Sequence, residues 1–321
     1  VWISEIMLQQ TQVKTVIPFY LDFMLRFPSI KNLSEKSTDE VLSSWSGLGY
    51  YTRARNLHRT SKIIISEHNG IMPNTVERLI TLPGIGRSTA GAIVALSLNK
   101  RAPILDGNAK RVFCRYHAIK AQPDNAEKKK ELWAIANEHL PLSDFRVYTQ
   151  ALMDLGATIC KKIPVCNRCP LTLSCASYLS SNTKSFPGSK KKVIQKKKSS
   201  IFIIIKNQRN QVLLVKRSIS GFWAELWSFP EIKEQNHAKT LAARLCGTEE
   251  FECKELPPFI HKFTHFELHI KPLLFTLKDN SRLHKKNDTI WATSKNIESL
   301  GIAKPVRKLL EKIWFQRKEE S

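Results

Sequence analysis

Apolar residues recur at every third or fourth position through roughly the first 180 residues. Because this spacing puts them on one face of a helix, we expect a series of helices there. The breaks fall near prolines, at Pro28, Pro73, Pro83, Pro103, Pro123 and Pro141. From Ser200 the pattern changes to short β-branched and apolar runs, at 201–205, 211–215 and 267–277. Helical spacing returns at 238–246 and 304–314, so the pattern predicts an all-helical domain followed by an α+β domain.

A lysine-rich stretch separates the two patterns. Residues 184–198 carry seven lysines and no acidic residue, a composition that cannot form a hydrophobic core. We therefore expect a helical domain over 1–183, a basic linker over 184–199 and an α+β domain over 200–317. The linker is either a tether that contacts phosphates or a solvated spacer, and a nuclear-import signal is a third interpretation.

Composition and charge narrow the class of partner. The chain has 321 residues, of which 42% are hydrophobic, enough for two domains with their own cores and too many for a wholly disordered chain. Lys and Arg total 51 against 28 Asp and Glu, so the formal net charge is +23, which favours nucleic acid as the partner. There is no run of eighteen apolar residues, so we expect no membrane-spanning segment. No secretory leader is recognisable, and because the sequence starts at Val1 inside an apolar periodic stretch, we expect part of the natural protein to precede it.

Four of the seven cysteines lie within sixteen positions. They are Cys160, Cys166, Cys169 and Cys175, separated by five, two and five residues. Thiols this close hold a metal centre more often than disulfides in a chain without a leader. We predict one [4Fe-4S] cluster, with zinc as the alternative, since structural zinc usually takes two C-x2-C pairs and only one is present. The basic residues of this loop, Lys161, Lys162 and Arg168, suggest that the cluster braces it against DNA.

A second motif, LPGIGRSTAGAI, occupies 82–93. Gly84 and Gly86 permit a tight turn, and Arg87 to Ala90 open a helix whose free amide groups can hold a phosphate. A plain tight turn between helices is the alternative. The motif resembles the helix-hairpin-helix of base-excision DNA glycosylases, and together with the cysteine loop it points to the iron-sulfur branch of that superfamily.

Three further stretches resemble the adenine DNA glycosylases of that branch, at 2–13, 47–58 and 103–112. An endonuclease III relative would be expected to have a lysine at the position of Ser88 and no glutamate at the position of Glu5. The resemblance, which covers Val1 to about Phe315, therefore implies a monofunctional glycosylase without strong lyase activity.

Excision of adenine requires a proton donor and a negative charge, which two carboxyl groups provide. On a helix, Glu5 shares a stripe with Gln9 and Gln12, and apolar neighbours, Ile3, Ile6, Met7 and Val13, would raise its pKa. We expect Glu5 to be the general acid. Asp106 precedes a helix, where capping is the ordinary role. The resemblance implies that Asp106 stabilises or attacks the sugar cation and that Asn108 orients the site.

The same resemblance implies the DNA contacts. Adenine must leave the duplex, with Gln10 and Tyr50 as wedges and with Thr11 and Leu48 flanking the opposite base. Core packing is the alternative for Tyr50. Ser88 and Lys110 match positions that line the active-site cavity of the family. Without the resemblance, Lys110 would be interpreted as a phosphate contact. The full set of expected DNA contacts is Gln9, Gln10, Thr11, Leu48, Tyr50, Gly84, Gly86, Arg87, Ser88 and Lys110.

The second domain resembles the Nudix-like C-terminal domain of the same family, with markers at 221–230 and 261–270. Residues 241–247 lack the glutamates that hold magnesium in Nudix hydrolases, so we expect no pyrophosphate hydrolysis. The family's loop that senses 8-oxoguanine matches Phe263, Thr264 and His265. Thr264, where the family has serine, is one departure, and the gap between Cys160 and Cys166, one residue shorter than usual, is another.

The sequence thus predicts a base-excision repair enzyme that hydrolyses adenine mispaired with 8-oxoguanine or guanine in double-stranded DNA. An endonuclease III-like or thymine-mismatch glycosylase and a non-catalytic iron-sulfur DNA-binding protein are the alternatives. We expect a monomer that does not bind membranes. The resemblance places it with the DNA of a bacterial cytoplasm, or in the nucleus or mitochondrion of a eukaryote.

Overall fold

The computed structural model describes residues 1–120, 125–188, 195–278 and 288–315. The chain forms two compact units. The first unit contains Val1–Ser34 and Arg59–Lys192, and the second contains Glu35–His58 and Val193–Ser321. This division differs from the expected boundaries, because a segment of the helical half, 35–58, groups with the C-terminal residues.

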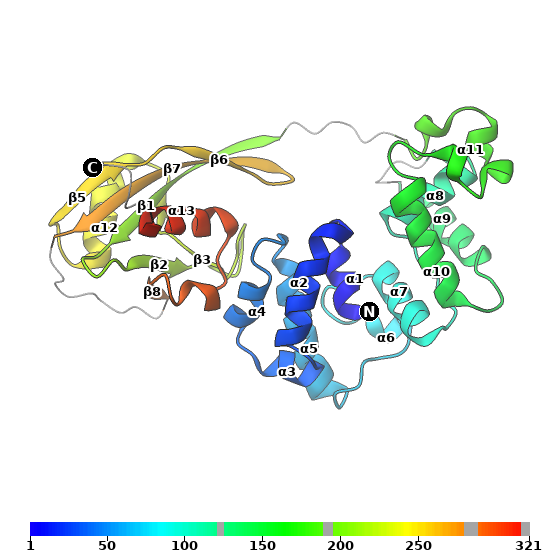
Figure 1. The fold of residues 1–321 in the computed structure, drawn as a ribbon, viewed down its shortest axis with the longest axis horizontal. Coiled ribbons are helices and arrows are strands. Elements are labelled where there is room, and N and C mark those ends of the chain that lie inside the picture. Colours follow the sequence, from blue (N-terminus) through cyan, green and yellow to red (C-terminus); the bar gives the residue numbers. More distant parts are fainter. Residues whose placement is uncertain (121–124, 189–194, 279–287, 316–321) are drawn as a thin grey trace. The chain divides into compact units, whose positions relative to one another are not determined.

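The first unit is helical, as the apolar periodicity predicts (Figure 1). Its principal helices are α1 (Trp2–Leu8), α2 (Val13–Arg26), α3 (Ile30–Glu35), α6 (Val76–Leu79), α7 (Arg87–Leu98), α8 (Gly107–Tyr116), α9 (Ala126–Glu138) and α10 (Phe145–Asp154). A further helix, α5 (Thr52–Glu67), begins in the second unit and ends in the first.

Apolar side chains from α7 to α10 form one core of this unit. Its fully buried members include Ala109, Phe113 and Leu132. Helix α7 approaches the segment before α8 so closely that a Cβ atom at Gly91 would collide with the carbonyl oxygen of Pro103. The glycine therefore brings that segment, and Asp106 after it, alongside α7.

The cysteine loop follows α10 without a break in the helix. The helix continues as one π-helical turn, η1 (Leu155–Ile159), and the loop then contains short helices, η2 (Cys166–Arg168), η3 (Thr172–Ser174), α11 (Ala176–Leu179) and η4 (Thr183–Ser185). A Cβ atom at Gly156 would lie 2.7 Å from the Cβ atom of Asn108, so this glycine lets the start of the loop pack directly on α8.

The second unit is built on a mixed sheet (Figure 1). Its strands are β1 (Lys196–Lys206), β2 (Val212–Lys216), β3 (Trp227–Ser228), β4 (Glu231–Ile232), β5 (Phe251–Glu255), β6 (Phe259–Lys262), β7 (Phe266–Leu277) and β8 (Thr289–Ala292). The strand order is β3-β2-β1-β7-β5, while β4 pairs with β1, β6 with β7 and β8 with β2. Strands β1 and β7 run parallel, with Ile203 opposite Leu273. Strand β1 starts within the range expected to be linker.

Helix α12 (Ala238–Cys246) covers one face of the sheet, packing Ala242 and Cys246 against Ile205 and Phe275. The remaining helical elements are η5 (Gln235–His237), η6 (Ile297–Ser299) and α13 (Lys304–Phe315). Both regions in which helical spacing returns, 238–246 and 304–314, are helices. The predicted fold class, an all-α part and an α+β part, is confirmed. Among the described residues, no helix has the length and apolar character needed to cross a membrane.

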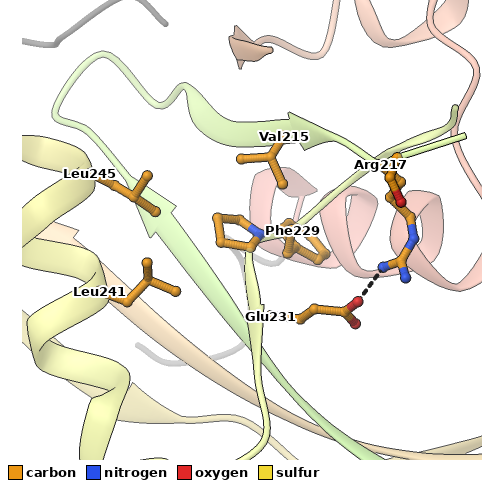
Figure 2. A pocket seen from close by; sticks show the side chains of 8 residues that line it. Val215, Arg217, Phe229, Glu231, Leu241 and Leu245 are labelled. Atoms are coloured by element: carbon orange, nitrogen blue, oxygen red, sulfur yellow. Dashed lines mark hydrogen bonds and ion pairs between the residues drawn. The ribbon is translucent and has the colours of Figure 1, made fainter. Parts of the chain in front are cut away.

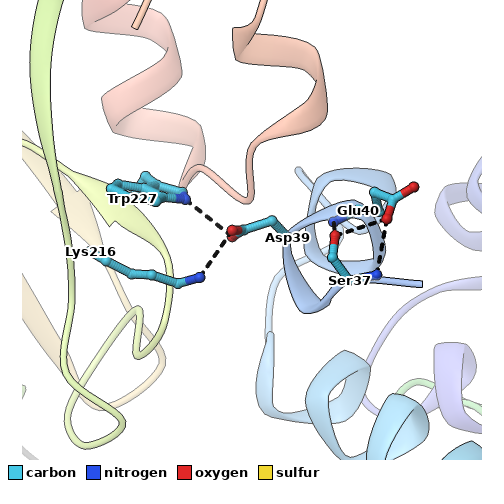
Figure 3. A network of polar contacts seen from close by, with 5 residues as sticks. All are labelled: Ser37, Asp39, Glu40, Lys216 and Trp227. Carbon is cyan, nitrogen blue, oxygen red and sulfur yellow. Dashed lines mark hydrogen bonds and ion pairs between the residues drawn. The ribbon is translucent and has the colours of Figure 1, made fainter. Parts of the chain in front are cut away.

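The 35–58 segment is held in the second unit by polar contacts. Helix α4 (Thr38–Ser44) starts at a capping box in which Ser37 and Glu40 exchange hydrogen bonds. From its first turn, Asp39 accepts hydrogen bonds from the Lys216 ammonium (2.9 Å) and the Trp227 indole (3.1 Å) (Figure 3). These contacts explain why a helical segment belongs with the sheet.

Candidate active site

Glu5 lies on α1 next to two buried side chains, Ile6 and Met7. The pKa of its carboxyl group is raised from 4.5 to about 7, first by burial and second by the Asp106 carboxylate, and the amino group of Val1 opposes both. The charge of Asp106 therefore acts on the carboxyl group of Glu5. Near neutral pH, Glu5 is divided between its protonated and ionised forms.

The helix of Glu5 is shorter than expected. Gln9 caps the C-terminus of α1, Gln10 has a left-handed backbone conformation with φ of 57°, and Gln12 caps the start of α2. The expected single helical stripe of Glu5, Gln9 and Gln12 is thus wrong, because the chain turns between two helices. Val13, expected to shield Glu5, is 56% exposed.

The turn directs Gln9 toward the hairpin. Its side-chain amide donates to the hydroxyl of Thr89 (3.2 Å) and to the carbonyl oxygen of Gly84 (3.4 Å). Thr11 is tied to the same turn, since its hydroxyl donates to the Gln9 carbonyl oxygen at 3.4 Å. The segment after Glu5 and the hairpin therefore form one polar site.

The hairpin leaves the start of α7 without a side-chain cap. Gly84 has φ of 80°, and Gly86 caps α7 without any side-chain hydrogen bond to the first amide groups of the helix. A Cβ atom at Gly86 would meet nothing within 4 Å, so internal packing does not require this glycine. Arg87 is exposed and stacks over Trp133 at 4.0 Å, and the Ser88 hydroxyl accepts the Leu105 amide at 3.0 Å.

Asp106 caps α8, as the ordinary interpretation of its position predicts. Its Oδ1 atom accepts the Ala109 amide at 2.8 Å. Because its charge also raises the pKa of Glu5, the same side chain both caps the helix and acts on Glu5. Lys110 follows on α8 and is half-buried.

Arg111 connects this site to the cysteine loop. Its guanidinium donates to Asn108 Oδ1 (2.8 Å), to the Gly156 carbonyl oxygen (2.7 Å) and to the Cys160 carbonyl oxygen (2.6 Å). Asn108 is therefore held by an arginine that also fixes the backbone of a cysteine. The sequence motifs assign no role to Arg111.

The four clustered cysteines line one cavity together with Arg115. Arg115 is 3% exposed and donates to Cys160 Sγ (3.3 Å), to the Lys161 carbonyl oxygen (2.6 Å) and to the carbonyl oxygens of Thr183 (3.1 Å) and Phe186 (3.2 Å). A buried cation that donates to a sulfur atom stabilises thiolates. The donor set and its charge thus fit a thiolate-bound iron-sulfur cluster.

Four thiols can hold either of the two candidate metal centres. Zinc takes its sulfur ligands at about 2.3 Å in a tetrahedron, whereas a [4Fe-4S] cluster is held by four cysteine thiolates. The four cysteines here line one shared cavity.

The expected lesion-sensing residues lie at the β6–β7 hairpin of the second unit. The Phe263 amide donates to the Phe266 carbonyl oxygen at 2.9 Å, and the two rings stack at 4.3 Å. Thr264 and His265 form the exposed tip. The Thr264 hydroxyl lies 2.8 Å from the hydroxyl of Tyr50, which is itself 42% exposed. Tyr50 is thus not a core residue.

A cavity of about 340 Å³ in this unit lies between α12 and the sheet edge (Figure 2). Leu241 and Leu245 of α12 form one wall. The carboxylate of Glu231 is in an ion pair with Arg217, with 2.6 Å between Glu231 Oε1 and Arg217 Nη1. Helix α12 carries no acidic residue, so the glutamates of a Nudix hydrolase have no counterpart on it.

The structure divides the expected residues between the two units. The first unit holds Glu5, Gln9, Gln10, Thr11, Gly84, Gly86, Arg87, Ser88, Asp106, Asn108, Lys110, Cys160, Cys166, Cys169 and Cys175. The second holds Leu48, Tyr50, Phe263, Thr264 and His265. The sequence does contain a signal that could have pointed to Arg111 and Arg115. The two arginines are four positions apart on α8 and therefore lie on the same face of the helix.

The fold and the site together define the helix-hairpin-helix class of base-excision DNA glycosylases, extended by a Nudix-like domain. Residues 3–138 match the HhH-GPD superfamily base excision DNA repair protein family, and residues 201–312 match the NUDIX domain family. The chain is 42% identical to the adenine DNA glycosylase of Buchnera aphidicola subsp. Acyrthosiphon pisum, over 97% of this chain and 89% of that protein. It is 32% identical to the Homo sapiens adenine DNA glycosylase, over 84% of this chain and 59% of that protein. The chain belongs to the adenine DNA glycosylase family.

Solved structures resemble just over half of the chain. A thermostable thymine-DNA glycosylase superposes with a TM-score of 0.51 at 26% identity, over 56% of this chain and 83% of that chain. An endonuclease III trapped on DNA superposes with a TM-score of 0.50 at 21% identity, over 56% and 84%. The second likeness concerns the fold alone.

Proposed function

We propose that this protein removes adenine from double-stranded DNA when adenine lies opposite 8-oxoguanine or guanine. The observation that carries the proposal is the pairing of Glu5, whose pKa is raised to about 7, with the Asp106 carboxylate. A carboxyl group with a raised pKa beside a second carboxyl group is what acid-assisted cleavage of a glycosidic bond needs.

In this proposal the carboxyl group of Glu5 donates its proton to a ring nitrogen of adenine. The bond between the base and C1′ breaks, and positive charge develops on the sugar. The Asp106 carboxylate stabilises this charge, while water supplies the oxygen that replaces adenine at C1′. Asn108, held by Arg111, fixes the side of the site next to Asp106.

DNA binding is supported by the hairpin and by surface charge. The amide groups at the start of α7 lack a side-chain cap, and no atom occupies the space beside Gly86. Lys161, Lys162 and Arg168 are exposed on the cysteine loop. A backbone phosphate at the helix start and cationic side chains nearby provide affinity without sequence preference.

We assign recognition of the opposite base to the residues of the second unit. Leu48 and Tyr50 lie on the loop before α5, and Tyr50 contacts Thr264 of the β6–β7 hairpin. The two segments form one surface, with the exposed Tyr50 ring and the Thr264 hydroxyl available to a base. The cavity beside α12 then has no role in pyrophosphate hydrolysis, because its carboxylate is paired with Arg217.

The four cysteines are proposed to hold one [4Fe-4S] cluster, with Arg115 stabilising the thiolates. The bound cluster would cross-link the loop and so present its basic residues to DNA. We place the protein in the compartment that contains the DNA on which it acts.

A strand-cleavage assay tests the proposed function. Duplexes labelled on the adenine strand, with adenine opposite 8-oxoguanine, guanine or thymine, are incubated with the protein and analysed with and without hot alkali. Breaks that appear only after alkali, and only opposite 8-oxoguanine or guanine, are expected. Breaks without alkali would indicate an endonuclease III-like lyase, and intact strands together with duplex binding would indicate a non-catalytic DNA-binding protein.

Thr264→Ala should reduce the preference for 8-oxoguanine over guanine more than it slows excision. The substitution removes a hydroxyl group that contacts Tyr50 and faces solvent, and it leaves the stacked Phe263 and Phe266 in place. Dissociation constants for duplexes containing each opposite base measure the preference. Thr293→Ala, which removes a hydroxyl group from a distant turn of the same unit, is the matched control. An equal loss on both duplexes would refute the assignment.

Arg115→Met should lower the amount of iron and sulfide that the purified protein retains, because it removes the cation that donates to Cys160 Sγ. The measurement is the broad visible absorption of the cluster, combined with iron and sulfide analysis. Arg101→Met, which removes an exposed arginine paired with Asn137, should retain the wild-type content. A colourless wild-type protein that contains zinc would contradict the cluster assignment itself.

A further inference from the structure

Arg53 is a buried arginine directly beneath the 47–50 loop. It lies in the first turn of α5 and is 8% exposed. Its Nη2 atom donates to the carbonyl oxygen of Gly49 (3.1 Å) and to that of Leu48 (3.4 Å). Its guanidinium carbon lies 5.4 Å from the centroid of the Tyr50 ring and 5.5 Å from that of Trp45.

The loop that this guanidinium supports has an unfavourable backbone conformation. Gly47 and Gly49 have φ values of 107° and 75°, and Tyr50, which is not glycine, has φ of 48°. A non-glycine residue keeps such a conformation only when surrounding contacts enforce it. The Gly49 carbonyl oxygen accepts from both Arg53 and the Trp45 indole (3.1 Å), so both contacts hold the residue before Tyr50.

We propose that Arg53 is a positioning residue that holds Tyr50 in the arrangement with which its ring reads the base opposite adenine. Leu48 is only 6% exposed and so supports the loop from within rather than facing a base. The inference rests on the proposed function, since it takes Tyr50 as part of the reading surface. Arg53 itself does not touch the DNA in this scheme. It acts through the backbone of Leu48 and Gly49 and through the face of the Tyr50 ring.

The side chain is suited to this task because of its geometry and charge. A planar guanidinium can donate to neighbouring carbonyl oxygens while its face rests against an aromatic ring, which a lysine ammonium cannot do. Burial lowers the pKa of Arg53 to about 10, with Tyr50 opposing the change, so the group remains charged at neutral pH.

The chain of contacts extends to the β6–β7 hairpin. Arg53 contacts the Tyr50 ring, and the hydroxyl of that ring lies 2.8 Å from the Thr264 hydroxyl. If the Tyr50 ring moves, the hydroxyl group that contacts Thr264 moves with it. Loss of Arg53 should therefore weaken the distinction between 8-oxoguanine and guanine rather than the chemistry at Glu5.

The test compares Arg53→Met with a matched variant on the same helix, Arg55→Met. Arg55 also anchors the second unit, by donating to the Ala224 carbonyl oxygen (2.7 Å) and pairing with Glu225 (3.3 Å), and its guanidinium is thus directed to the 224–225 segment rather than to the 47–50 loop. For each variant we would measure melting temperature, dissociation constants for duplexes with 8-oxoguanine or guanine opposite a non-cleavable adenine analogue, and the single-turnover excision rate at saturating protein.

For Arg53→Met, the ratio of the two dissociation constants should fall by about tenfold, the scale of a lost hydrogen bond to a charged group. The excision rate at saturation should change by less than about threefold, because Glu5 and Asp106 are untouched. For Arg55→Met, the melting temperature should fall while the ratio stays at the wild-type value.

Two results would overturn the inference. The ratio could be retained in Arg53→Met, including the case in which both duplexes are bound more weakly by the same factor, which would indicate a structural role. Alternatively, the ratio could fall equally in Arg55→Met. If Arg53→Met does not fold, Arg53→Lys provides the same readouts with the charge and the apolar stem preserved, and an unchanged ratio there would overturn the inference. A wild-type protein that shows no preference would instead refute the proposed function.

Discussion

Glu5→Gln is expected to lower the single-turnover rate of adenine excision by about 10²–10⁴-fold, the usual contribution of a positioned general acid. The glutamine has nearly the same size but cannot donate a carboxylic proton to the base. Affinity for the duplex should be almost unchanged, because no phosphate contact is removed. The measurements are excision under saturating protein and binding of a duplex with a non-cleavable adenine analogue.

Glu77→Gln is the matched control for this substitution. It removes the same charge from an exposed position in the first turn of α6, close in sequence to the hairpin. It should excise adenine at the wild-type rate. If Glu5→Gln also retained wild-type turnover, Glu5 would not be the acid and the proposed mechanism would be wrong.

The sequence predicted residue types and motifs better than it predicted where the chain turns. Glu5 and Asp106 were expected in one site, and the charge of Asp106 does reach Glu5. The helical continuation to Gln9 and Gln12 was wrong because polar residues at helical spacing fit two helices joined by a turn equally well. A left-handed residue such as Gln10 leaves no reliable sequence signal when it is not glycine.

Long-range contacts account for the other differences. The 35–58 segment has ordinary helical periodicity, so nothing local shows that Asp39 contacts Lys216 and Trp227 of a later strand pair. Similarly, the contact between Tyr50 and Thr264 joins positions 214 residues apart. Local patterns cannot specify such pairs, because they depend on how strands β2, β6 and β7 are placed in the sheet.

The distribution of residues between the units has a consequence for interpreting variants. The proposed acid Glu5, the Asp106 carboxylate and the cysteine loop belong to the first unit, whereas the proposed reading residues of the opposite base belong to the second. Substitutions in the second unit should therefore change the preference between opposite bases, and substitutions in the first should change the excision rate. Within the first unit, Arg111 joins Asn108 to the backbone of Cys160 and so connects the site to the cysteine loop.

Asp106→Asn should lower the excision rate by about 10²–10³-fold, the scale of a lost electrostatic contact to a transition state. Asparagine caps helices as well as aspartate does, so α8 and the melting temperature should be preserved. Asp106→Ala, which loses the cap as well, should also reduce the free energy of unfolding by about 1 kcal/mol. The comparison separates the charge of Asp106 from its hydrogen bond to the Ala109 amide.

The pH dependence of Asp106→Asn provides an independent test. An acid that must be protonated acts only below its pKa, so the wild-type rate should fall as the pH rises above about 7, the pKa of Glu5. The negative charge of Asp106 is the second cause of that raised pKa, after burial. Without this charge the pKa of Glu5 should decrease, and the fall in the residual rate should begin at a lower pH. A pH profile that keeps the wild-type midpoint would show that the two carboxyl groups do not act on each other during excision.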